Sequence, residues 1–130
     1  AMMIVTREAI KRMSKKNKGS GGSIVLLSSV SARIGSPGFC VAYAASKGAV
    51  DSFAWGAAQE VVGEGIRINA VSPGIIDTEI QPKGRVEKTG PNLPIGRVGQ
   101  PEEVAQAIVW LLSENASYVA GSNLDVAAGR

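Results

Sequence analysis

The sequence predicts an α/β fold with a doubly wound parallel sheet, and three observations support this prediction. Stretches with helical periodicity alternate with short apolar runs along the 130 residues. Segments rich in glycine and proline separate these stretches. The length and an apolar content of 45% fit one globular domain or part of one. Alternation of helices and strands favours parallel strands joined by right-handed helical crossovers.

The first predicted element is an amphipathic helix over residues 2–16, whose apolar stripe is Met2, Val5, Ala9 and Met13. The glycine-rich stretch NKGSGG ends this helix. SIVLLSS follows as a continuous apolar run that closes on two hydroxyls, which is typical of a strand buried on both faces. The stretch ARIGSPG is then expected to be a loop.

A second helix is predicted from about Val41 to Val62, and the glycines of GEG end it. IRINAV is the next predicted strand, and the turn residues Ser72-Pro73-Gly74 break it. Residues 77–100 are rich in proline, glycine and charge, which indicates a long loop with room for one short helix.

A third helix is expected to begin at Pro101, where the missing amide hydrogen costs nothing and the acidic residues behind it complement the helix dipole. Its buried stripe is predicted to be Val104, Ile108 and Leu111. NLDVA near the end is a last short strand.

Composition excludes several classes of function. The chain has no histidine, so a Ser-His-Asp triad and a histidine-ligated zinc site are excluded, and we expect no metal. The net charge of +3 comes largely from a lysine-rich run around residues 11–18, which we interpret as the solvated end of a helix. A nucleic-acid-binding module would need more stacking aromatics than the 5% present, so no nucleic-acid partner is expected.

The cellular setting is predicted from cysteine and hydropathy. A single cysteine, Cys40, excludes an internal disulfide and suits a reducing cytoplasm. The apolar runs are too short to span a bilayer, and the start lacks the order of a secretory signal. We therefore expect a cytoplasmic protein that does not bind a membrane.

Three polar features fall where strands of the predicted sheet end: Ser28-Ser29, Ser72-Pro73-Gly74 and Tyr43. In doubly wound sheets, ligands bind outside the carboxyl ends of the strands. Tyr43 and Lys47 are one turn apart at the start of the second helix, and we expect both to face this crevice. The apolar residues on the same helix face, which should pack on the sheet, are Val50, Ala54, Ala57 and Val61.

Tyr43 and Lys47 can together replace the missing histidine as an acid–base pair. The ordinary tyrosine pKa of about 10 makes this side chain a poor catalyst at neutral pH. A nearby ammonium favours the phenolate by Coulomb attraction, so Tyr43 can exchange a proton with a substrate oxygen. Ser29 is placed to hydrogen-bond the same oxygen. A lone Tyr-x-x-x-Lys is equally typical of a surface pair on a helix, and the specificity here comes from its neighbours in the sequence.

The chain resembles the short-chain dehydrogenase/reductase family over essentially its whole length. Five stretches occur in family order: GGSIVLLSSVSA, YAASKGAV, GIRINAVSPGIIDTEI, PIGRVGQPEEVAQAIVWLLS and SYVAGSNLDVAAG. Within the family the chain is similar to bacterial glucose-1-dehydrogenase-like and 3-oxoacyl-reductase-like oxidoreductases. The resemblance implies a Rossmann-like fold, NAD or NADP as cofactor, and interconversion of a secondary alcohol, such as a sugar, and a ketone by hydride transfer.

The resemblance also implies catalytic roles. Tyr43 would be the catalytic acid/base, Lys47 would favour its phenolate and bind the nicotinamide ribose, and Ser29 would position the substrate oxygen. The spacing from Ser29 to Tyr43 is one residue longer than is common in the family. Ser28 lies too far from Tyr43 and Ser31 too near by the same count, so Ser29 keeps the assignment.

The resemblance extends to the cofactor and the substrate. The backbone around Pro73, Gly74 and Ile76 would line the nicotinamide, and Thr78 would reach its carboxamide or the pyrophosphate. Residues 79–100 would form the mobile substrate-binding segment. Two further residues have structural interpretations: Asn69 as a hydrogen-bonding residue of the scaffold and Cys40 as a small side chain lining the pocket.

The chain resembles only the second half of a family member. Residues 1–130 are therefore interpreted as the catalytic half of one Rossmann-fold domain, with the glycine-rich pyrophosphate turn and the family's catalytic asparagine expected before Ala1. The SIVLL strand would then leave an open, apolar sheet edge. We expect this segment alone neither to bind a dinucleotide tightly nor to fold stably as a monomer.

Self-association is predicted from the second helix, which is apolar on more than one face. Its outer face carries Ala45, Ala49, Phe53 and Gly56, with Trp55 nearby. Resembling family members pair such helices in dimers and tetramers, so we expect a homodimer or homotetramer. The alternative is that the long loop of residues 79–100 covers this face of the helix. A different class of function, a non-catalytic oligomerisation or scaffolding piece, also stays open, although such a piece has no physical need of the Ser-Tyr-Lys set.

Overall fold

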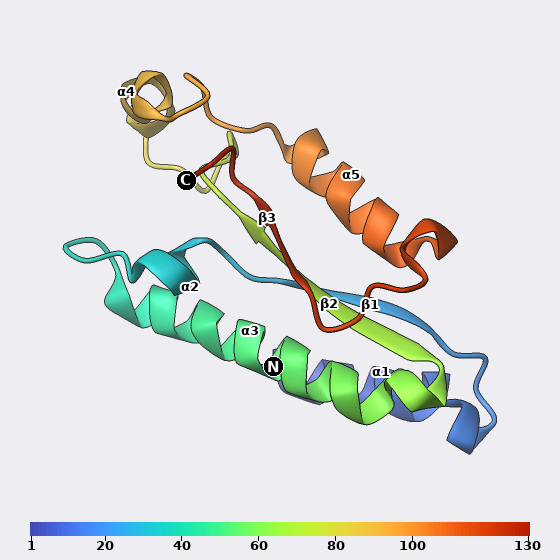
Figure 1. Cartoon of the computed structure of the whole chain (residues 1–130). Helices are drawn as coiled ribbons and strands as arrows, with labels where there is room; N and C mark the ends of the chain where they lie inside the picture. Colours follow the sequence, from blue (N-terminus) through green and yellow to red (C-terminus); the bar gives the residue numbers. More distant parts are fainter.

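The computed structural model describes residues 1–130 as a three-stranded parallel sheet with helices on both faces (Figure 1). The strands lie in the order β1-β2-β3 and are β1 (Gly22–Leu27), β2 (Ile66–Pro73) and β3 (Asn123–Val126). The helices are α1 (Met2–Met13), α2 (Ser31–Ile34), α3 (Val41–Val61), α4 (Arg85–Thr89) and α5 (Pro101–Leu112). Short 3₁₀ turns occupy Lys15–Asn17, Val62–Glu64, Gly90–Asn92 and Glu114–Ala116. The predicted α/β class and the predicted order of the main elements are confirmed.

The central strand β2 contacts both helical layers, and its sequence explains why. Side chains of a strand alternate between the two faces of the sheet. Ile66, Ile68 and Ala70 pack in one cluster with α3 and part of α1, whereas Val71 packs in a second cluster with α5. All four side chains are fully buried. A strand covered on both faces therefore buries side chains on both sides, and in β2 these include the polar Asn69 and Ser72.

Helix α3 packs on the sheet through the predicted residues. Val50, Ala54, Ala57 and Val61 are all buried in the cluster with β1 and β2. Small alanines let the helix approach the strands closely, and this contact fixes where the first turn of α3 lies. Figure 1 shows α1 and α3 on one side of the sheet and α5 on the other.

The predicted apolar stripe of α1 was confirmed at Met2 and Met13 and wrong at Val5. In α1, Val5 is 68% exposed, and the residues that pack toward the core are Met2, Ile10 and Met13, with Thr6 buried between them. Thr6 is accommodated because its hydroxyl donates to the Met2 carbonyl at 3.1 Å. The polar residue hid the true stripe from a search for apolar periodicity.

The stretch after β1 is not all loop. Residues 31–34 form one turn, α2, in which the amide of Gly35 donates to the carbonyl of Ser31. Gly35 then reverses the chain with a left-handed φ of 72°, a conformation that glycine adopts without strain. Because α2 is a single turn, the glycine and proline residues after it made the whole stretch look like a loop in the sequence.

Candidate functional site

The carboxyl ends of β1 and β2 build one side of a cavity of about 550 Å³. Pairing continues past the end of β1, since the amide of Ser28 donates to the Val71 carbonyl at 2.8 Å and that of Val30 to the Pro73 carbonyl at 3.1 Å. This register holds the Ser28-Ser29 pair beside the end of β2. The cavity is lined by Ser29, Val30, Ser31, Ile34, Ser36, Pro37, Phe39, Cys40, Tyr43, Gly74, Ile75, Ile80, Gln81, Pro82, Arg85 and Arg130.

Tyr43 and Lys47 lie at the start of α3, next to this cavity. Tyr43 lines it and is 42% exposed. The Lys47 ammonium donates to the Leu27 carbonyl at the end of β1, at 2.8 Å, and lies 5.7 Å from the centre of the Tyr43 ring. The backbone of β1 therefore holds the lysine on the tyrosine side of the helix.

The two serines after β1 have different surroundings. The Ser28 hydroxyl is 2% exposed and donates to the Lys47 carbonyl of α3 at 3.2 Å. Ser29 is 8% exposed, lines the cavity and accepts only the Ser31 amide at 3.2 Å. The Ser29 hydroxyl proton is thus free for a ligand in the cavity, whereas that of Ser28 is engaged in joining strand to helix.

Besides Tyr43 and Lys47, the resemblance assigned four residues to the cofactor: Pro73, Gly74, Ile76 and Thr78. Gly74 lines the cavity beside Tyr43, and Pro73, half-buried, ends β2. Ile76 instead lines a second, smaller cavity, and Thr78 is exposed and lines neither cavity. A side chain at position 74 would come within 3.0 Å of the Ala127 backbone, so glycine permits close packing against the chain after β3.

Asn69 and Cys40 lie where their structural interpretations place them. Asn69 is fully buried, donates to the Val119 carbonyl at 2.9 Å and accepts the Ser122 amide at 3.0 Å. It therefore joins β2 to the segment leading into β3. Cys40 precedes α3 and lines the cavity with a half-buried side chain.

Two cavity residues were not singled out from the sequence as site residues. Phe39 precedes α3, and the Arg85 guanidinium lies over its ring at 4.4 Å from the ring centre. Arg85 belongs to α4, so this contact joins the two segments that flank the Tyr43 cavity. Spacing along the chain gave no signal for a pair 46 positions apart.

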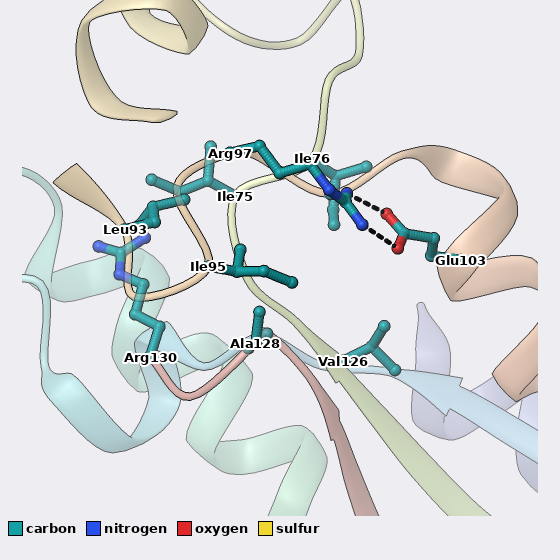
Figure 2. Close-up of a pocket in the computed structure, with 11 residues that line it drawn as sticks. Ile75, Ile76, Leu93, Ile95, Arg97, Glu103, Val126, Ala128 and Arg130 are labelled. Carbon is teal, nitrogen blue, oxygen red and sulfur yellow. Dashed lines mark hydrogen bonds and ion pairs between the residues drawn. The ribbon is translucent and has the colours of Figure 1, made fainter. Parts of the chain in front are cut away.

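A second cavity of about 70 Å³ lies on the other side of Ile75 (Figure 2). Ile75 and Arg130 line both cavities. Figure 2 shows the small cavity edged by an ion pair, in which the two Arg97 nitrogens each donate to a Glu103 oxygen at 2.8 Å. Arg97, and next the Gln100 amide, lower the pKa of Glu103 to about 2. The same contacts cap the first turn of α5.

The structure contains no helix with the length and apolar character that crossing a bilayer requires. No group of three or more His, Cys, Asp or Glu side chains is placed to hold a metal ion.

Comparison with known proteins decides the family. The model of a family described as enoyl-(acyl carrier protein) reductase matches residues 1–130. The chain is 57% identical to the uncharacterized oxidoreductase YgfF of Escherichia coli over 128 residues, which cover 95% of this chain and 52% of that protein. The chain belongs to the short-chain dehydrogenase/reductase family. The predicted family is thus confirmed, and the homologues support oxidoreductase activity in general.

Other relatives agree. The 3-oxoacyl-[acyl-carrier-protein] reductase FabG of Thermotoga maritima is 41% identical over 128 residues, which cover 96% of this chain and 50% of that protein. A crystal structure of a betaketoacyl-ACP reductase matches with a TM-score of 0.71 and 39% identity, over 82% of this chain and 46% of that chain. The chain spans about half the length of the relatives it matches.

Proposed function

We propose that the full-length protein containing this chain is an NAD- or NADP-dependent oxidoreductase that interconverts a secondary alcohol and a ketone. In this proposal residues 1–130 are the catalytic half of a single Rossmann-fold domain, working in the cytoplasm. The observation that carries the proposal is the meeting of Tyr43 and Ser29 on one cavity, with Lys47 tied to the Leu27 carbonyl beside the tyrosine ring.

The acid–base step belongs to Tyr43. When the alcohol is oxidised, the phenolate oxygen takes the hydroxyl proton, and in the reverse direction the phenol returns it to the carbonyl oxygen. The Lys47 ammonium lies 5.7 Å from the ring centre, and its charge would offset the negative charge that develops on the phenol oxygen as the proton moves. The free hydroxyl of Ser29 donates to the substrate oxygen and holds it for this transfer.

The residues at the strand ends fit the nicotinamide and ribose part of the cofactor. The Lys47 ammonium has three donor hydrogens and uses one on the Leu27 carbonyl, which leaves two for ribose hydroxyls. Pro73 and Gly74 supply backbone at the end of β2 for one face of the ring. The assignment of Ile76 and Thr78 rests on the family resemblance, since neither lines the Tyr43 cavity. Bound there, the nicotinamide would accept or supply the hydride.

The test uses the full-length protein with NAD⁺ or NADP⁺ and a panel of secondary alcohols and sugars. Reduced nicotinamide is followed by its absorbance. We expect turnover with one of the two cofactors and at least one class of alcohol. Absence of turnover with every combination, in a protein that still self-associates, would favour the scaffolding alternative.

We also propose that the protein forms a homodimer or homotetramer through the outer face of α3. On this face Ala45, Ala49 and Gly56 are exposed, and the indole of Trp55 is 60% exposed. Phe53, predicted on the same face, instead packs half-buried against the sheet cluster. Residues 79–100 do not cover the exposed indole. Light scattering at micromolar concentration should give at least twice the mass of a monomer, and Trp55→Glu should lower that mass.

A further inference from the structure

The charged side chains that line the Tyr43 cavity are all positive. Of its sixteen lining residues, Arg85 and Arg130 are the two that always carry a full charge, and no aspartate or glutamate lines the cavity. Both charges are therefore positive. A cleft lined by charges of one sign attracts ligands of the opposite sign.

Arg85 lacks the polar partners that hold several other arginines in the fold, and it shares this with the exposed Arg12 and Arg130. Arg33 pairs with Asp125, Arg97 pairs with Glu103, and Arg67 donates to three backbone carbonyls. The half-buried Arg85 forms no ion pair and no side-chain hydrogen bond, since every chain carboxylate lies beyond 4.0 Å. Its guanidinium stacks on Phe39 instead, at 4.4 Å from the ring centre.

Stacking on an aromatic ring orients a guanidinium without using its donors. The planar fork keeps its N–H groups at the edge, in the geometry that binds a carboxylate or phosphate through two parallel hydrogen bonds. The Arg85 guanidinium thus lies against the exposed Phe39 ring at the cavity wall, and no acceptor of the chain takes its five donors.

We propose that the alcohol or ketone substrate carries an anionic group of carboxylate or phosphate type, which Arg85 binds with support from Arg130. This inference rests on the proposed function of the same cavity. The reacting oxygen lies at Tyr43 and Ser29, and the anionic group lies at the arginine wall. A cavity of about 550 Å³ has room for both ends of a small molecule.

The test compares matched substrates in the full-length protein. A short hydroxy acid is set against its methyl ester, and a polyol phosphate against the free polyol, so that each pair differs in charge. We expect kcat/KM to favour the charged member of at least one pair, and the pair that responds identifies the anion. Arg85→Gln should raise KM for that substrate by about 10- to 100-fold, the range for a lost charge-assisted hydrogen bond.

Three controls sharpen the result. Arg85→Gln should leave the KM of the neutral member and of the nicotinamide cofactor unchanged. Arg85→Lys keeps the charge but not the fork, so it should restore only part of the loss. Lys83→Gln removes an exposed charge two positions away that does not line the cavity, and it should have no effect.

A binding measurement keeps the inference testable apart from turnover. Calorimetric titration with inorganic phosphate and with malonate should detect binding of one anion to the wild-type protein, and Arg85→Gln should weaken it. Equal kcat/KM within both substrate pairs, with neutral alcohols turned over, would overturn the anion inference and leave the proposed function intact. A rise in cofactor KM in Arg85→Gln, or no anion binding by calorimetry, would also overturn it.

Discussion

The two ends of the sheet are built from the same strands and the same helix, yet they differ in how completely their polar groups are paired. At the amino end, the Glu64 carboxylate accepts from the Ser14 hydroxyl and, at 2.7 Å, from the Lys16 ammonium. The backbones of Gly21 and Gly65 touch there, since a side chain carbon at position 21 would lie 2.5 Å from the Gly65 oxygen. This end is closed.

At the carboxyl end, which we call the open end, polar side chains line a cavity and lack partners within the chain. The Tyr43 side chain is 42% exposed, the Ser29 hydroxyl proton has no acceptor in the chain, and Arg85 has no carboxylate. A folded protein normally pairs its buried polar groups. This difference supports the proposal that the chemistry takes place at the carboxyl end, where hydrogen-bonding groups lack partners in the chain, and that the amino end contributes to stability.

The largest expected effect is at the open end. Tyr43→Phe in the full-length protein removes only the phenol oxygen, so kcat should fall by about 10²- to 10⁴-fold, the usual contribution of general acid–base catalysis. Cofactor binding and the melting temperature should stay close to wild type. Tyr118→Phe is the matched control, because Tyr118 is fully exposed and lies outside the cavity. Near wild-type turnover by Tyr43→Phe would refute the assignment.

The adjacent residues Ser28 and Ser29 are expected to have different roles, one in stability and one in activity. Ser29→Ala should lower kcat by about 10²-fold, as loss of one positioned hydrogen-bond donor does, with little change in stability. Ser28→Ala removes the link to the Lys47 carbonyl and should cost about 1 kcal/mol of stability. Steady-state kinetics and thermal unfolding of both variants check this. If Ser28→Ala loses the activity and Ser29→Ala keeps it, the serine assignment is wrong.

At the closed end, Gly21→Ala should destabilise the fold without altering kcat per folded molecule. Gly21 has a φ of +79°, and its added carbon would meet the Gly65 backbone. The expected loss is at least about 2 kcal/mol in the free energy of unfolding. Gly63→Ala is the control, because Gly63 has no atom within 4 Å of an added carbon. Equal denaturation midpoints for the two variants would contradict this.

The smallest effect is the pH dependence of the closed end. Lys16, and next Ser14, hold the pKa of Glu64 below the ordinary 4.5. A lowered pKa in the folded state means that the contribution is present above pH 4.5 and is lost as pH falls below that value. Glu64→Gln and Lys16→Met should each flatten the decline of stability with acid. An unchanged slope in Glu64→Gln, followed by denaturant unfolding, would show that the carboxylate is not coupled to folding.

The fold could be predicted largely from the sequence, because β2 and the inner face of α3 are long, periodic and apolar. The prediction failed in α1, where Thr6 is buried and Val5 is exposed, since a threonine can satisfy its own hydroxyl on the helix backbone. It also missed α2, a single turn too short for periodicity to reveal.

The site could be predicted only in part. Tyr43 and Lys47 share a helix, so their proximity follows from spacing. Arg85 contacts Phe39 because of how residues 77–100 fold back over the site. This segment has no hydrophobic periodicity from which the position of Arg85 could be predicted. The roles of Ser29 and Tyr43 remain predictions that the variants above test. The roles of Lys47, Pro73, Gly74, Ile76 and Thr78 also remain predictions.

The most direct test of the central claim follows one labelled atom. The full-length protein is incubated with oxidised nicotinamide cofactor and a secondary alcohol that it accepts, carrying deuterium on the carbinol carbon. Mass spectrometry then measures deuterium in the reduced cofactor. If the open end of the sheet is a hydride-transfer site, the reduced nicotinamide should carry the deuterium while the hydroxyl proton leaves through Tyr43. Oxidation of the alcohol with the deuterium released to water would contradict that claim.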